Sequence, residues 1–531
     1  MWRPPIPINF LALHYAWIIF CSLLGIVVFL PYGNVPAIDA YFFGASASTE
    51  SGLNTIDVKD LKTYQQLFLY FIPMFTNLGF INIIVVAVRL YWFERHIRKN
   101  GNKLLARSPH GPTKDVEAQT PPEDTSTGEN QQETLQTGES RAAPDTECAK
   151  FKERVITFSA DANPPPNDTK ALYVPPPKER DNGTHAWILL LNARTLLRVN
   201  EDILSSKRKP KINISTMVDN LGFTLTPDSM ITFRDAVWPM LAMSFLAFAG
   251  NTCYPVVLRL VIWTMSKLAP KNSSMRETLQ FLLEHPRRCY TLLFPSNTTW
   301  ILFGILFTMN FIDVVLIVTL DLDNPEVNSL PMTPRIFAAI FQAASSRHTG
   351  TATFNLAKVN PGVQFSLLVM MYIAILPIAI SMRSSNTYEE TSLGFYAQER
   401  ALDESRSSSY VMTHIRNQLS FDLWYVFLGT FCICVTEADK VMDLNDPAFS
   451  VFAIFFEVMS AYGNVGLSLG HPDVMTSLSG KFRTFSKVVI CAMMIRGRHR
   501  GLPYALDRAI MLPDERRGED GREVDAATKD Q

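Results

Sequence analysis

Long and short runs of apolar residues alternate along this chain. The long runs, which we expect to be membrane-crossing helices, cover residues 10–30, 67–93, 236–265, 300–320, 365–380, 421–435 and 485–495. The short runs, at 38–47, 336–345 and 449–460, have about a dozen residues or fewer, whereas a helix needs about 20 residues to cross a bilayer. The pattern predicts an all-α membrane protein in which some short helices enter the membrane without crossing it.

Each short run is followed by a turn that contains glycine. The clearest turn is 462–468 (YGNVGLS), and similar turns lie at 48–55, 219–226 and 347–351. Irregular backbone at membrane depth is tolerated only where it is buried in protein or lines a water-filled cavity. Glycine, which lacks Cβ, lets successive carbonyls turn toward an axis, and rings of carbonyls can replace the hydration shell of a cation. We therefore interpret the four turns as re-entrant pore loops.

The order of span, short helix, glycine turn and span recurs along the chain, and such internal repetition is strong evidence for the fold. It predicts four tandem membrane-pore-membrane repeats. The second repeat has its turn and its second span, but residues 185–204 hold only a modest apolar run. We therefore expect the second repeat to lack its first span and its pore helix.

The expected domain organisation follows from these repeats and from the polar segments between them. Residues 100 to about 182 are rich in Pro, Ser, Thr, Glu and Gln, a composition typical of disorder. The predicted segments are repeat 1 (1–99), a cytoplasmic, largely disordered linker (100–212), truncated repeat 2 (213–270), a cytoplasmic connection (271–298), repeat 3 (299–384), a cytoplasmic loop (385–413), repeat 4 (414–513) and a charged cytoplasmic tail (514–531).

Composition fits this class of protein. Hydrophobic residues make up 47% of the chain and charged residues 19%, as in a polytopic membrane protein with soluble insertions. The net charge of −1 gives no reason to expect nucleic acid as a partner. The seven cysteines have no metal-type spacing, and we find neither a phosphate-binding glycine loop nor paired acids or histidines on one face of a span. We expect no cofactor and no enzymatic activity.

Charged flanks predict the orientation, because Lys and Arg near span ends mark the cytoplasmic side. The basic residues are Arg95, Arg98, Lys99, Lys103, Arg287, Arg288 and those in 496–500. Both termini are then expected to be cytoplasmic. The acidic residues of the opposite side are Asp321, Asp323, Glu326, Glu437, Asp439, Asp443 and Asp446. Such residues either concentrate cations at an outer mouth or are ordinary residues of soluble loops, and the sequence leaves both interpretations open.

Several long motifs resemble the fungal Trk potassium transporters of the Trk/Ktr/HKT superfamily. They lie at 45–55 (ASASTESGLNT), 221–230 (LGFTLTPDSM), 250–259 (GNTCYPVVLR), 456–469 and 493–507 (MMIRGRHRGLPYALD). In that family four membrane-pore-membrane units surround one central pathway, and each unit gives one filter glycine. Carried over by motif, the ion-binding filter residues are Ser51, Gly52, Leu221, Gly222, Thr349, Gly350, Val465 and Gly466.

The resemblance has further implications. The family has a positively charged residue in its last span, below the filter, for which Arg496 and Arg498 are both candidates. An arginine on an ion pathway is an electrostatic barrier and could gate it. The alternative is a basic cluster that binds anionic lipid. The family also suggests a homodimer, and a glycine at position 52 resembles its potassium-type members rather than its sodium-type members.

The sequence therefore predicts potassium uptake across the plasma membrane, driven by the membrane potential. Two alternatives stay open: a non-conducting product of a truncated or mis-spliced gene, because of the incomplete second repeat, and a sodium-permeable member of the superfamily. A seven-helix receptor would explain the spans, but it would have no reason to carry four glycine turns.

Overall fold

The computed structural model describes residues 10–77, 91, 221–224, 226, 228–270, 273–286, 290, 292–382 and 422–500. Over these residues the chain is helical, and its sole β-type pairing is an isolated bridge between His471 and Val474. All the helices named below belong to one compact unit.

Several predictions fall outside the described residues. They concern the linker 100–212, the expected loss of the first half of repeat 2, the span 67–93 beyond Asn77, the loop 385–413 and the tail 514–531. The same holds for the basic residues Arg95, Arg98, Lys99, Lys103, Arg287 and Arg288. The predicted domain boundaries stay predictions.

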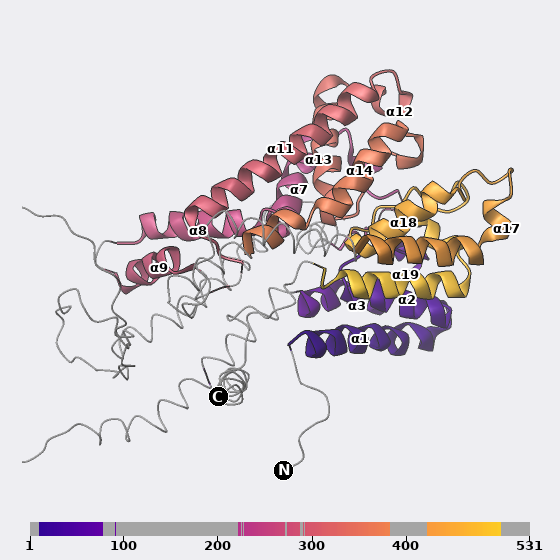
Figure 1. Cartoon of the computed structure of the whole chain (residues 1–531), viewed down its shortest axis with the longest axis horizontal. Helices are drawn as coiled ribbons and strands as arrows, with labels where there is room; N and C mark the ends of the chain where they lie inside the picture. Colours follow the sequence, from indigo (N-terminus) through magenta and orange to yellow (C-terminus); the bar gives the residue numbers. More distant parts are fainter. Residues whose placement is uncertain are drawn as a thin grey trace, which may run out of the picture. The chain divides into compact units, whose positions relative to one another are not determined.

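The first repeat consists of α1 (Phe10–Phe29), α2 (Ala37–Ser48) and α3 (Thr63–Thr76). Helices α1 and α2 lie side by side and approach closely at two glycines (Figure 1). A Cβ on Gly44 would be 2.2 Å from the carbonyl oxygen of Ser22, and one on Gly25 would be 2.6 Å from Cα of Gly44. Small residues are common where membrane helices pack without a hydrophobic driving force between them. This contact fixes the short helix against the first long one.

The third and fourth repeats have the same order of helices. Repeat 3 contains α11 (Ser296–Leu320), α12 (Pro325–Asn328), α13 (Met332–His348) and α14 (Pro361–Ile373). Repeat 4 contains a helix at Asp422–Thr436, α17 (Ala438–Val441), α18 (Val451–Gly463) and α19 (Thr484–Gly497). The short helices α2 and α13 contain the predicted short runs 38–47 and 336–345, and α18 covers all but the first two residues of the run 449–460.

Among the described residues, three helices are long and apolar enough to cross a membrane: Ala12–Tyr32, Ser296–Leu320 and Pro361–Met382. Large apolar side chains of α11 face outward, since Trp300, Ile301 and Phe307 are each more than 60% exposed. Such a surface is stable in lipid rather than in water. The helices and their outward apolar side chains agree with the predicted all-α membrane class.

The predicted span 236–265 differs from the structure. It is divided into α7 (Val237–Gly250) and α8 (Tyr254–Leu268), which meet at an angle of 94°. The helical backbone is interrupted at residues 251–253, and Pro255 lies in the first turn of α8, where its missing N–H costs nothing. Beyond the break, Leu258 and Ile262 pack with apolar residues of α9 (Ser274–Glu284). The sequence thus located this apolar segment but did not predict the break within it.

Candidate functional site

The four predicted filter glycines share an unusual backbone conformation. The φ angles of Gly52, Gly222, Gly350 and Gly466 are 80°, 82°, 68° and 93°. This left-handed region is disfavoured for residues that carry a Cβ. Each turn therefore has the conformation for which glycine was expected.

The four glycines also come together in space. A Cβ added to each would collide with a carbonyl oxygen of the next loop, at 2.2, 2.7, 2.1 and 2.3 Å in chain order. The contacts run from Gly52 to Leu221, from Gly222 to Thr349, from Gly350 to Val465, and from Gly466 back to Ser51. The carbonyl contacted in each case belongs to the residue before the next glycine. All eight predicted filter residues thus lie in one closed ring of contacts.

A serine in the last turn or two of each short helix orders the loop that follows. The carbonyl oxygens of Ser46, Ser345 and Ser460 accept from Ser51 N, Gly350 N and Val465 N, at 2.9, 3.2 and 3.0 Å. The hydroxyls of Ser46 and Ser345 also donate to the carbonyls of Leu53 and Thr351. The hydroxyl of Ser460 accepts from Gly466 N. These three serines were missed from the sequence. The signal was present, since each precedes its glycine by five or six positions.

The two candidate arginines lie in different surroundings. The guanidinium of Arg498 forms an ion pair of 2.8 Å with Glu50, which directly precedes Ser51 in the first loop, and both side chains are less than 10% exposed. Arg496 instead donates to the hydroxyl of Tyr15 in α1 and lies over the ring of Tyr425. The structure therefore brings Arg498 next to the first filter loop.

A second buried ion pair lies behind the third loop. Arg347, in the last turn of α13, pairs with Asp313 of α11 at 3.2 Å, and both side chains are at most 1% exposed. Arg347 also donates to Asn310 at 2.8 Å, and Ser366 of α14 donates to Asp313 at 3.1 Å. Three helices of repeat 3 thus meet at one carboxylate. An acid within an apolar span was a signal of such a partner.

The first and fourth repeats are joined in a similar way. Lys487 of α19 pairs with Asp39, in the first turn of α2, at 2.6 Å, and both side chains are at most 10% exposed. The hydroxyl of Ser477 donates to the Asn54 carbonyl at 2.6 Å. These contacts hold the first loop against the fourth.

Three of the predicted outer carboxylates accept hydrogen bonds from backbone N–H groups. Asp321 accepts from Asn360 N at the start of α14, and Glu437 accepts from Arg483 N at the start of α19. Glu326 accepts from Asn355 N, beyond the third loop. Burial on its own would raise the pKa of Glu437, but hydrogen bonds from Lys440 and from the start of α19 outweigh it, so that the pKa of this carboxyl lies below its usual value. These three residues therefore have a structural role at the ends of helices and loops.

A family model identifies the broader class. The model of the TrkH family, described as cation transport protein, matches residues 212–519, which is more than half of the chain. This chain belongs to the TrkH family. The match contains Gly222, Gly350 and Gly466 and begins after Gly52. The family consists of transport proteins, in agreement with the prediction that the chain is not an enzyme.

Individual fungal proteins are similar to the same share of the chain. A potassium transporter of Candida albicans is 51% identical over 298 residues, which cover 56% of this chain and 28% of that protein. The low-affinity potassium transport protein of Saccharomyces cerevisiae is 46% identical over 327 residues, covering 56% and 37%. Potassium transport protein 1 of Schizosaccharomyces pombe is 47% identical over 298 residues, covering 56% and 35%. The resemblance to fungal Trk transporters is thereby confirmed.

The matched part of this chain spans about a third of the length of these relatives. Among solved structures, the potassium transporter TrkH of Vibrio parahaemolyticus is similar at 14% identity, with a TM-score of 0.48 and coverage of 94% of this chain and 85% of that one.

Proposed function

We propose that this chain carries potassium ions across the plasma membrane through the ring formed by its four glycine loops. The observation that supports the proposal most is the closure of the ring, in which each glycine contacts the carbonyl before the next glycine and the fourth loop returns to the first. Backbone carbonyls arranged about one axis are the groups that replace the water around a cation in known filters. The second loop takes part in this ring, which favours conduction over the alternative of a non-conducting product.

The membrane potential supplies the driving force in this proposal. It contributes about 2.3 kcal/mol per elementary charge for each 100 mV, enough to concentrate a cation without a cofactor or nucleotide. Potassium is proposed rather than sodium because the named relatives are potassium transporters and because position 52 is glycine. The membrane is proposed to be the plasma membrane, with both termini in the cytoplasm, lipid around the outward apolar helices and a homodimer as the assembly.

The test is uptake of radioactive rubidium by cells that lack their own potassium uptake and express this chain. We expect saturable uptake that potassium inhibits strongly and sodium inhibits weakly, and that Gly466→Asp abolishes. Surface abundance of the protein is measured in parallel. Absence of uptake at normal surface abundance would contradict the proposal, and equal inhibition by sodium and potassium would favour the sodium-permeable alternative.

Arg498 is proposed as the positive charge below the filter. Its ion pair with Glu50 places the guanidinium beside the first loop, whereas Arg496 contacts Tyr15 and Tyr425. A charge on the pathway raises the barrier for a cation. We therefore expect Arg498→Gln to lower surface abundance, since Glu50 is left buried without its cation. Divided by surface abundance, the maximal rate of rubidium uptake is expected to increase by about tenfold, equivalent to about 1.4 kcal/mol of barrier.

Arg496→Gln is the matched control for Arg498→Gln, since it removes the same charge two residues away. In this proposal the contacts of Arg496 with Tyr15 and Tyr425 do not set the barrier, so the variant's maximal rate of uptake is expected to stay within about twofold of the original chain. An increase in Arg496→Gln without one in Arg498→Gln would reverse the assignment.

A further inference from the structure

The second loop is docked onto the third by backbone contacts on the far side of the two glycines. Met230 N donates to the Ala352 carbonyl at 3.1 Å, and Ala352 N donates to the hydroxyl of Ser229 at 3.0 Å. Met230 is fully buried and packs with Phe341 of α13. The non-glycine residue Ser229 has a φ of 58°, a conformation that surrounding contacts must stabilise. Residues of repeat 3 therefore hold the end of the second loop in place.

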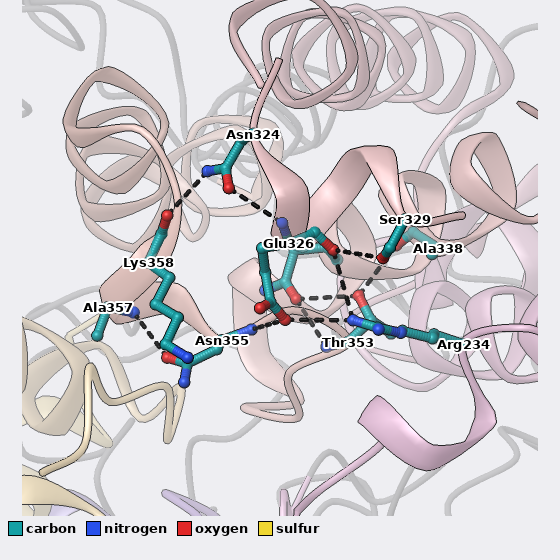
Figure 2. Close-up of polar contacts among 10 residues, drawn as sticks. Arg234, Asn324, Glu326, Ser329, Ala338, Thr353, Asn355, Ala357 and Lys358 are labelled. Carbon is teal, nitrogen blue, oxygen red and sulfur yellow. Dashed lines mark hydrogen bonds and ion pairs between the residues drawn. The ribbon is translucent and has the colours of Figure 1, made fainter. Parts of the chain in front are cut away.

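The carboxylate of Glu326 contacts residues of both the second and the third repeat at this junction, as Figure 2 shows. Oε1 of Glu326 is 3.2 Å from Nη1 of Arg234, which follows the second loop, and also accepts from Asn355 N, which follows the third, at 3.2 Å. Both ionic side chains are partly buried, at 24% and 18% exposure. This one oxygen thus contacts the segments that follow the second and the third loop.

Glu326 is itself held in place by its neighbours. Its backbone N–H donates to the side chain of Asn324 at 3.0 Å, and the amide of Asn324 donates to the carbonyl of Lys358 at 2.8 Å (Figure 2). On the third loop, the hydroxyl of Thr353 donates to the Ala338 carbonyl of α13 at 3.2 Å. A charged pair anchored by such contacts can transmit position, because its members have little freedom to reorient.

The pair joins the segments that follow the second and third loops, whose glycine contact is the longest of the four in the ring. The contact that a Cβ on Gly222 would make with the Thr349 carbonyl is 2.7 Å, whereas the other three are between 2.1 and 2.3 Å. The corresponding junction of the first and fourth loops is made by Asn54 and Ser477 and by the more deeply buried ion pair between Lys487 and Asp39. The second and third loops thus have the longer glycine contact, and the ion pair between their repeats is the more exposed of the two.

We propose that Glu326 and Arg234 form a positioning pair that sets the second filter loop against the third and thereby contributes to the choice between potassium and sodium. This inference rests on the proposed function of the ring. Selectivity depends on the number and placement of the carbonyls around the ion, so a shift of one loop is expected to change selectivity more than it changes the amount of folded protein.

The variants are Glu326→Gln, Arg234→Gln and the exchange Arg234→Glu with Glu326→Arg. The control is Asp439→Asn, which removes an exposed ion pair with Arg483 within repeat 4. For each variant we measure surface abundance, rubidium uptake and its inhibition by sodium. We expect either single substitution to reduce the preference for rubidium over sodium by about tenfold (about 1.4 kcal/mol) at surface abundance within about twofold of the original. The exchange is expected to recover most of the preference, and the control to leave it unchanged.

Unchanged selectivity in both single variants would overturn the proposal, whatever their surface abundance. If abundance fell while selectivity stayed the same, the pair would only stabilise the fold. Hydrogen exchange of the amides of Met230 and Ala352, measured by mass spectrometry on the purified protein, tests the docking without transport. Faster exchange in Glu326→Gln than in Asp439→Asn supports the positioning role, and equal exchange overturns it. A chain that fails to transport rubidium but shows the difference in exchange would refute the proposed function and leave the docking intact.

Discussion

Gly350→Ala and Gly466→Ala are expected to reduce rubidium uptake by more than tenfold. The new Cβ would lie 2.1 Å from the Val465 carbonyl oxygen in the first variant and 2.3 Å from that of Ser51 in the second, and such distances force one backbone away from the other. The left-handed φ adds roughly 1–2 kcal/mol of strain. The measurement is the initial rate of uptake, divided by the surface abundance of each variant.

Gly470→Ala is the control that separates the two effects. Its φ is also positive, at 70°, but the nearest atom to an added Cβ is 3.7 Å away. This variant carries the strain without the collision and is expected to retain most of its uptake. Uptake by Gly350→Ala that equals uptake by Gly470→Ala would contradict the close approach of the loops.

Arg347→Met is expected to destabilise the protein by about 3–5 kcal/mol, because it leaves Asp313 buried without its cation. Both side chains of the pair are at most 1% exposed, so solvent cannot replace the missing charge. Replacing both partners, as Arg347→Met with Asp313→Leu, is expected to recover much of the loss, since apolar pairs of similar volume are often neutral in such positions. The measurement is the thermal unfolding midpoint of the detergent-purified protein.

Arg483→Met provides the comparison for a surface pair. Arg483 and Asp439 are 51% and 81% exposed, and pairs of this kind contribute about 0–1 kcal/mol. A midpoint for Arg347→Met that matches that of Arg483→Met would show that the buried pair does not stabilise repeat 3.

The parts of the structure that the sequence predicted well are those that local pattern determines. The short runs at 38–47 and 449–460 correspond to α2 (Ala37–Ser48) and α18 (Val451–Gly463). The four glycine turns have the left-handed backbone that their composition implied. Length, apolar content and glycine are local properties, and they suffice to place a short helix and the turn that ends it.

The features that the sequence did not reveal depend on contacts between distant segments. Lys487 and Asp39 are 448 residues apart in the chain, and no local pattern joins them. The choice between Arg496 and Arg498 likewise depended on where Glu50 lies. The break after Gly250 had a local signal, since Pro255 follows this glycine five residues later. The apolar residues on both sides nevertheless gave the pattern of a single span. For the outer carboxylates the sequence left two interpretations open, a cation-concentrating mouth and ordinary loop residues, whereas Asp321 and Glu437 bind the first residues of helices.

The central claim, that the ring of four loops passes potassium, is tested most directly with this chain purified and placed in liposomes. Radioactive rubidium is supplied outside, and a defined inside-negative potential is imposed. The account predicts accumulation that rises with the potential, that potassium prevents and sodium does not, and that Gly466→Asp eliminates. Uptake independent of the potential, or equal in the original chain and in Gly466→Asp, would contradict it.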